Sequence, residues 1–219
     1  MVPLHLRAID ELLAEAIVFH GHACPGQVLG VRMAQAGCRE VGVDDPRAAG
    51  KSLVVFVEID RCATDAIEAL TGVSLGKRTL KHVDLGKTAA TFVSRVSGTA
   101  VRIVARDDAR EAARRSVPGE PDPRRAQMLA YRDMPEPLLL DLQRVTIAPG
   151  WLDRSRLRVR CDACGEGVTY GRERHVTGRV LCGACSGDGY YHYDGSHTAS
   201  RALPLSMESV EAITEREGG

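Results

Sequence analysis

Four cysteines toward the C-terminal end of the chain lie in two Cys-x-x-Cys pairs, and their spacing strongly constrains the fold. Cys161 and Cys164 form one pair, Cys182 and Cys185 form the other, and 17 residues separate the two pairs. Each pair can bind one ion from a tight turn, and the separation allows the second pair to return to the same ion. The pattern therefore predicts a structural Zn²⁺ site. Redox-active pairs are the alternative, but no thioredoxin-like pattern accompanies them.

The expected zinc module occupies residues 150–219, after a core domain over residues 1–149, because Pro149-Gly150 is typical of a domain boundary. A module of this size buries little apolar surface, so the metal would supply much of its folding free energy. The chain has seven cysteines, and four of them have metal-ligand spacing. This usage favours metal binding in a reducing compartment over a disulfide framework.

Charge and hydropathy exclude several classes of partner. The formal net charge is zero, so no overall positive field attracts nucleic acid, and nucleic acid is an unlikely partner. The N-terminal segment lacks a cationic start followed by an unbroken apolar run, so we expect no signal peptide. No run of about 18 apolar residues is present, so we expect no membrane span. These observations together predict a cytoplasmic protein.

A second group of metal-binding and nucleophilic side chains lies near the N-terminus. Residues 19–26 read Phe-His-Gly-His-Ala-Cys-Pro-Gly, which places His20, His22 and Cys24 within five residues. Imidazole and thiolate are ligands that Zn²⁺ and similar transition metals prefer. Pro25 suits the first position of a helix, where unpaired N–H groups and the helix dipole stabilise a thiolate. We therefore expect Cys24 to act as a ligand or a nucleophile.

Hydrophobic periodicity predicts an α+β domain around this segment. Two helices are followed by a strand, a helix, a run of strands and further helices, an order typical of a mixed or antiparallel sheet with packed helices. The expected helices cover residues 4–19, 25–42, 61–70 and 107–115, with a polar helix ending near residue 132. The expected strands cover residues 52–59, 79–83, 88–96, 101–105 and 142–148.

Cys62 is the candidate third ligand for a metal in this domain. It follows the apolar strand pattern of residues 52–59 and opens the helical pattern of residues 61–70. Strand ends of this kind are where α/β-type domains place their chemistry. With His22 and Cys24, Cys62 would form a His-Cys-Cys set for Zn²⁺ or another transition metal, with a fourth position open to substrate.

Two further side chains are catalytic candidates beside this metal, together with Cys24. Asp65 lies three residues after Cys62 on the same helix face, so it could act as an acid/base or orient a ligand imidazole. His20 could be a ligand, a base or a residue that closes the preceding helix. A Cys24 thiolate acting without metal stays open as an alternative. Three basic residues are either solvated turn residues or groups that recognise an anion: Lys77, Arg78 and Lys87.

These motifs together resemble the FmdE family, which takes its name from the formylmethanofuran dehydrogenase operon. The likeness runs through FHGHACPGQVLGVRMA, VEIDRCATDAIEALTGVSLGKRTLKHVDLGKTAATF, CDACGE and LCGAC, with a gap over residues 107–155. The resemblance implies an α+β core, a homodimer and a treble-clef-like zinc finger. It also implies a metal-capable site near His20, His22, Cys24 and Cys62.

Two classes of function fit these features. The first is an enzyme component or accessory protein of a molybdenum- or tungsten-dependent formylmethanofuran or formate dehydrogenase, acting in one-carbon redox metabolism on an unknown small molecule. The sequence has no Rossmann glycine fingerprint, P-loop or iron–sulfur cysteine run, so a redox cofactor would belong to a partner. The alternative is a metal- or cofactor-handling or sensing protein whose finger docks a protein partner or acts as a regulator. Whether the chain is itself an enzyme stays open.

Overall fold

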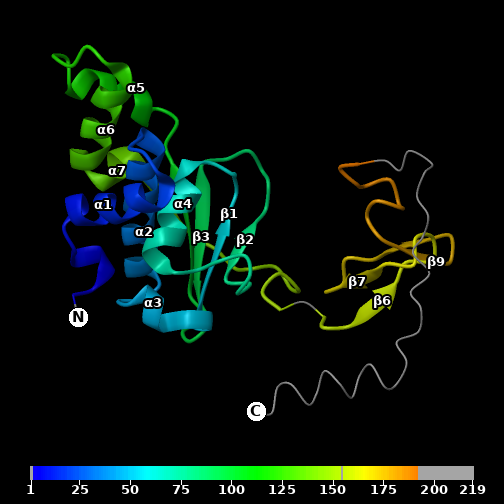
Figure 1. Ribbon diagram of the computed structural model, residues 1–219. Helices are drawn as coiled ribbons and strands as arrows, with labels where there is room; N and C mark the ends of the chain where they lie inside the picture. Colours follow the sequence, from blue (N-terminus) through cyan, green and yellow to red (C-terminus); the bar gives the residue numbers. More distant parts are fainter. Residues whose placement is uncertain (1, 154, 192–219) are drawn as a thin grey trace, which may run out of the picture. The chain divides into compact units, whose positions relative to one another are not determined.

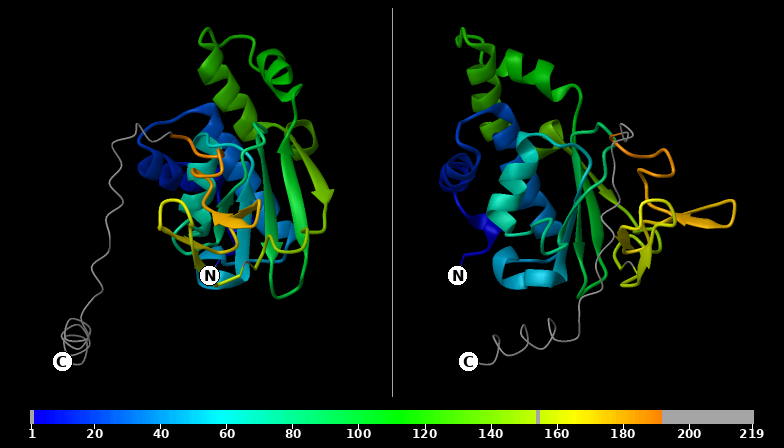
Figure 2. Two further views of the ribbon diagram at one scale, coloured as in Figure 1. Left: turned by 90° about the vertical axis from the view of Figure 1, so that its right-hand side faces the viewer. Right: turned by 45° about the vertical axis from the view of Figure 1, so that its right-hand side comes forward.

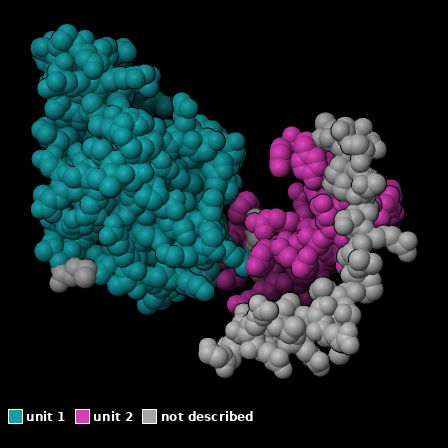
Figure 3. All heavy atoms as spheres, viewed as in Figure 1, with its two compact units in different colours: residues 1–148 teal, residues 149–219 magenta. Residues whose placement is uncertain are grey.

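The computed structural model describes residues 2–153 and 155–191. The chain divides into two compact units, residues 1–148 and residues 149–219 (Figure 3). Part of the expected zinc module, residues 192–219, lies outside the described residues.

The N-terminal unit is built on one mixed five-stranded sheet with the strand order β2-β1-β3-β4-β5 (Figure 1). β1 (Leu53–Val57) pairs in parallel with β2 (Leu80–His82) and antiparallel with β3 (Ala89–Ser94). β3 pairs antiparallel with β4 (Ala100–Ala105), which pairs antiparallel with β5 (Leu140–Arg144). The predicted α+β class with a mixed sheet is therefore confirmed.

α2 and α4 lie along one face of the sheet and α1 packs on both of them, whereas α5 and α6 lie beyond the end of the strands, with α6 against α2 (Figure 1 and Figure 2). α2 is central, because it packs against α1, α4, α6 and strand β4. Its buried side chains meet those of β1, β3 and β4 in a single hydrophobic core. The five main helices are α1 (Ile9–His20), α2 (Pro25–Glu40), α4 (Cys62–Thr71), α5 (Ala109–Ser116) and α6 (Pro123–Asp133).

Several short elements differ from the sequence-based expectation. The helix expected over residues 4–19 is a 3-10 turn, η1 (Leu4–Leu6), followed by the separate α1. The helices α3 (Pro46–Ala49) and α7 (Glu136–Leu139), and the 3-10 turn η2 (Gly50–Ser52), were not predicted. Elements of three or four residues are too short to show hydrophobic periodicity. Because α7 runs directly into β5, that strand begins before the position expected from the sequence.

A glycine on α2 sets how closely α2 and α4 approach. A Cβ at Gly30 would lie 2.4 Å from the backbone oxygen of Ala63 and 2.7 Å from the Cβ of Ala66. These contacts involve backbone and a buried alanine, so neither can move aside without moving α4. Gly30 thereby allows the N-terminal ends of both helices to reach the same site.

We expect Gly30→Ala to lower the free energy of unfolding by about 1–3 kcal/mol, because overpacking at a helix interface outweighs the gain in helix propensity. The measurement is chemical denaturation of the purified protein. Gly76→Ala is the control, since a Cβ there meets nothing within 4 Å. Wild-type stability in Gly30→Ala would show that the two helices adjust without cost.

An arginine on α2 holds the C-terminal end of α6. The guanidinium of Arg32 donates to the backbone oxygens of Tyr131 and Arg132, both at 2.9 Å, and of Met134 at 3.0 Å. These carbonyls at the helix end would otherwise lack partners. Arg32 therefore fixes α6 against α2, and α5 packs in turn on α6.

The described part of the C-terminal unit contains two small hairpins. β6 (Arg158–Arg160) pairs with β7 (Gly167–Thr169), and β8 (Arg174–Val176) pairs with β9 (Arg179–Leu181). Among the described residues of this unit, the buried hydrophobic side chains are those of Cys161 and Leu181 alone. The apolar core is correspondingly small.

Within the described part of the chain, no helix has both the length and the apolar character needed to cross a lipid bilayer.

Candidate metal centres

Three side chains in the N-terminal unit converge on one point. His20, Cys24 and Cys62 each offer a ligand atom, and these atoms all lie within 4.8 Å of one another. A distance of this size lets one ion contact all three atoms after small side-chain rotations, since metal–ligand bonds are about 2.0–2.3 Å long. The donor set of one imidazole and two thiols suits Zn²⁺.

The three residues lie at the ends of three helices. His20 is the last residue of α1, and Gly21 follows it in the left-handed conformation with φ 94°, which favours glycine. Cys24 is the N-cap of α2, directly before Pro25 at the first helical position. Cys62 is the first residue of α4. Two helix N-termini therefore meet at the cluster, because α2 begins directly after Cys24 and α4 begins at Cys62.

Asp65 fixes the ring of His20. The Asp65 carboxylate lies 2.7 Å from Nδ1 of His20, although the two residues are 45 positions apart. The Nε2 atom of His20 is buried and has no hydrogen-bond partner among the described residues. Zinc-binding histidines commonly have a carboxylate on one imidazole nitrogen and the metal on the other, and here the second nitrogen is available for a metal.

Without a bound cation, the surroundings of Cys62 do not favour the thiolate form of its side chain. Burial raises the pKa of this thiol above its ordinary value, and the neighbouring Cys24 raises it further. In the absence of a cation the protonated form of Cys62 is thus favoured. A metal ion would displace the proton, because thiol ligands bind metal as thiolates.

His22, the imidazole expected as the ligand, does not belong to this cluster. Its ring lies beside that of His20, with the ring centroids 4.4 Å apart, and the residue is exposed. The structure instead brings His20, expected as a catalytic residue, together with the two thiols. Of the predicted site residues, Cys24, Cys62, His20 and Asp65 therefore meet in one place, and His22 lies next to them.

Gln27 is a residue of the site that the sequence pattern did not single out. Its side chain is fully buried, and its Nε2 donates to the backbone oxygen of Cys62 at 2.6 Å. The Oε1 atom has no partner among the residues that the structure describes. Gln27 thereby connects the first turn of α2 to the start of α4. The sequence feature that could have indicated Gln27 is its position three residues after Cys24, on the buried face of a helix.

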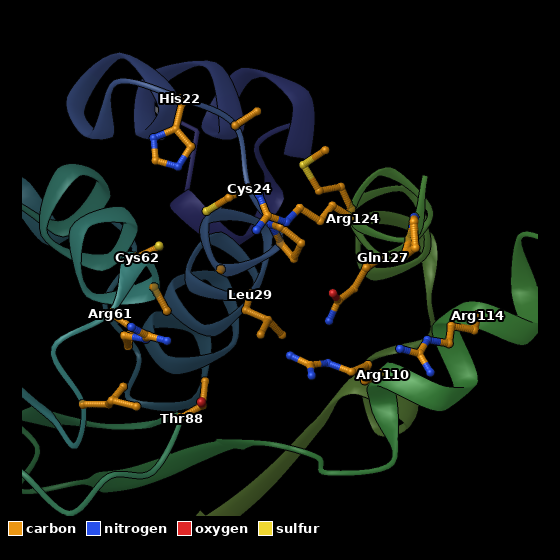
Figure 4. Close-up of a pocket in the computed structure, with 17 residues that line it drawn as sticks. His22, Cys24, Leu29, Arg61, Cys62, Thr88, Arg110, Arg114, Arg124 and Gln127 are labelled. Atoms are coloured by element: carbon orange, nitrogen blue, oxygen red, sulfur yellow. The ribbon is translucent and has the colours of Figure 1, made fainter. Parts of the chain in front are cut away.

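A cavity of about 750 Å³ opens beside the two thiols. In Figure 4 the sulfurs of Cys24 and Cys62 lie close together at one end of the cavity, and His22 lies above them. Leu29 lies near the middle of this view. Four arginines also line the cavity: Arg61 at the start of α4, Arg110 and Arg114 on α5, and Arg124 on α6. None of the basic residues expected to recognise an anion lines this cavity: Lys77, Arg78 and Lys87.

The four cysteines of the C-terminal unit form a second cluster. The sulfurs of Cys161, Cys164, Cys182 and Cys185 all lie within 4.8 Å of one another, so this cluster could hold a metal ion. The backbone N–H of Cys182 donates to the sulfur of Cys161 at 3.3 Å, and that of Cys185 donates to the sulfur of Cys182 at 3.4 Å. Such hydrogen bonds stabilise thiolate ligands in a tight turn.

The local backbone favours the thiolate of Cys161. Burial by itself would raise the pKa of this thiol, but hydrogen bonds from the backbone N–H groups of Cys164, Cys182 and Ala163 lower it to about 6. Burial and the neighbouring thiols raise the pKa of Cys185 to about 12. The thiolate of Cys161 is thus favoured before a cation binds, whereas Cys185 would lose its proton on binding.

Known proteins resemble the chain in sequence and in fold. A family model described as FmdE, molybdenum formylmethanofuran dehydrogenase operon, matches residues 19–143. A protein of Archaeoglobus fulgidus named probable S-adenosyl-L-methionine-binding protein is 39% identical over 97 residues, which are 43% of this chain. The chain covers only 26% of the length of that relative.

A solved structure shares the fold. It is an FmdE-like protein of the tungsten formylmethanofuran dehydrogenase type from Syntrophus aciditrophicus, with a TM-score of 0.58 and 20% sequence identity. The match covers 87% of this chain and 99% of that one.

Proposed function

The chain belongs to the FmdE family, and we propose that it is a metal-binding accessory component whose core unit holds an open, catalytic-type metal site. The proposed ligands are Nε2 of His20 and the sulfurs of Cys24 and Cys62. The sequence-based assignment of His22 as the imidazole ligand is replaced in this proposal. His22 lies at the exposed edge of the site, where it could exchange protons with a bound substrate.

The observation that carries the proposal is the state of His20. Its Nδ1 is held by Asp65, while its buried Nε2 has no partner among the described residues. A buried polar atom without a partner costs about 1–3 kcal/mol, so such atoms usually have a ligand or a function. The other two ligand groups of the cluster, Cys24 and Cys62, are both thiols. The residues present therefore fit a zinc ion.

Three protein ligands are typical of zinc sites that keep one position for substrate. When bound, the ion would supply a Lewis acid for a donor atom of the substrate. Residues of the chain would position the ligands of this ion. Asp65 would keep the His20 ring in one tautomer and orientation, and Gln27 would hold the start of α4, and with it Cys62, at its distance from α2.

The C-terminal unit has a structural role in this proposal. Four thiolates close the coordination shell of Zn²⁺, so that site leaves no position for substrate. We further propose a molybdenum- or tungsten-dependent formylmethanofuran or formate dehydrogenase as the partner, and a homodimeric assembly, on the strength of the family alone. The free thiols favour a reducing compartment such as the cytoplasm.

Asp65→Asn is expected to weaken zinc binding at the core site by roughly 10- to 100-fold, as for other carboxylates that orient ligand histidines. The amide oxygen can still accept a hydrogen bond from Nδ1, but it lacks the charge that increases the basicity of the ring. The measurement is competition for zinc with a chromophoric chelator. The quantity compared is the zinc affinity of the weaker of the two sites.

Asp60→Asn is the matched control, because Asp60 is exposed just before α4 and belongs to neither metal cluster. It should bind zinc as the wild type does. Unchanged core-site affinity in Asp65→Asn would contradict the role of His20 as a ligand held by Asp65.

A further inference from the structure

The arginines that line the core cavity lack carboxylate partners, whereas two arginines next to them in the sequence have such partners. Arg115 on α5 pairs with Glu111 at 2.9 Å, and Arg125 on α6 pairs with Glu120 at 3.0 Å. Within residues 2–153 and 155–191, the guanidinium groups of the four cavity arginines have no ion pair: Arg61, Arg110, Arg114 and Arg124. Arg115 and Arg125, which do not line the cavity, thus have carboxylate partners. The arginines that line the cavity have none.

The four cavity arginines come from separate parts of the chain. Arg61 precedes α4, whereas Arg110 and Arg114 lie one turn apart on α5 and Arg124 lies at the start of α6. In Figure 4 the side chains of Arg61 and Arg110 point into the cavity from opposite walls. Like charges gathered around one cavity repel each other, and an anion placed between them removes this cost.

The remaining lining limits the kind of anion. Leu29, Ile59 and Met128 add apolar surface to the cavity lining, and Gln127 adds an amide. A volume of about 750 Å³ is typical of sites for organic ligands and much larger than a bare phosphate needs. Guanidinium groups bind carboxylates and phosphates through paired hydrogen bonds.

We propose that this cavity binds a small organic anion. Its carboxylate or phosphate group contacts Arg110, Arg114 and Arg124, its apolar body lies against Leu29 and Met128, and its other end reaches the core metal. The contact with the metal rests on the proposed function above. The contact with the arginines depends only on their convergence.

Isothermal titration calorimetry on the zinc-loaded full chain at low ionic strength tests the anion site. The probes are two charged molecules, each compared with an uncharged relative. Succinate is compared with succinamide, which has the same size, and glycerol 3-phosphate is compared with glycerol, which lacks the phosphate group. We expect one charged member to bind and its neutral analogue not to bind. The pair that responds identifies the anionic group as carboxylate or phosphate.

Variants locate the site. Arg110→Gln combined with Arg114→Gln, and separately Arg124→Gln, should weaken binding of the charged probe by roughly tenfold or more, the usual effect of losing a charge-assisted hydrogen bond. Arg115→Gln and Arg125→Gln are matched controls on the same helices and should bind as the wild type does. Thermal melting of each variant verifies that it is folded.

Two results would overturn the inference: equal binding of the charged and neutral probes, or equal affinity in the cavity variants and the control variants. Zinc content measured on the same samples separates this failure from failure of the proposed function. A metal-loaded core site without arginine-dependent binding would contradict only the anion site. Arginine-dependent binding to a core without metal would support the anion site and contradict the metal proposal.

Discussion

Cys161→Ser is expected to unfold the C-terminal unit while the N-terminal unit stays folded. The described part of the C-terminal unit buries only Cys161 and Leu181 as hydrophobic side chains, so metal binding must supply most of its stability. Zinc contributes about 10–16 kcal/mol in comparable small modules, and a serine oxygen is a poor substitute for a thiolate. The N-terminal unit has a separate core.

The measurement is amide hydrogen exchange read by mass spectrometry on the full chain. Peptides from residues 158–181 should exchange almost completely in Cys161→Ser, and peptides from β1 and α2 should stay protected. Ser186→Ala is the control, since it removes one hydrogen bond to the backbone oxygen of Gly183 and leaves all four thiols. Wild-type protection of the hairpins in Cys161→Ser would show that the unit folds without its metal.

Cys24→Ser is expected to remove the core metal without unfolding the core. Metal content per chain should fall from about two ions to about one, because a site with three protein ligands rarely keeps its ion after losing a thiolate. Cys24 is half-buried at the start of α2, and its side chain makes no cap hydrogen bond there, so serine fits in its place. The melting temperature measured without metal should therefore change little.

His22→Ala is the informative comparison for this prediction. It should keep both metals, because its ring lies beside His20 and outside the ligand cluster. Metal content measured by mass spectrometry on protein purified without chelator separates the cases. A Cys24→Ser protein with full metal content would contradict the ligand assignment, and loss of metal in His22→Ala would return the role to His22.

Much of this architecture was predictable because it depends on local patterns. The Cys-x-x-Cys spacing placed four sulfurs around one point, and Pro25 marked the start of α2 as expected. Cys62 opens α4 after a buried strand, as the apolar run before it indicated. Helix caps and strand patterns involve neighbours in the sequence, so the sequence alone reveals them.

The sequence could not show which of the two histidines lies with the thiols, because a distant residue holds His20 there. Both His20 and His22 lie within reach of Cys24 along the chain. The left-handed turn at Gly21 ends α1 with His20 directed to Asp65, which is on α4. Only the packing of α1 against α4 brings that carboxylate to His20.

The arginine-lined cavity was hidden for a similar reason. Arg110, Arg114 and Arg124 lie in a segment without a recognisable motif, where the likeness to the family had a gap. Their position depends on α6, which Arg32 fixes to α2, and on α5 packed against α6. The basic residues that the sequence offered for anion binding are not part of the cavity lining: Lys77, Arg78 and Lys87.

The most direct test of the core centre is anomalous X-ray diffraction from crystals of the full chain, recorded on both sides of the zinc absorption edge. The proposed centre predicts a peak about 2.0–2.1 Å from Nε2 of His20 and about 2.3 Å from the sulfurs of Cys24 and Cys62, in addition to a peak among the four C-terminal cysteines. A single peak at the C-terminal cluster, or a core peak bound to His22 instead of His20, would contradict it.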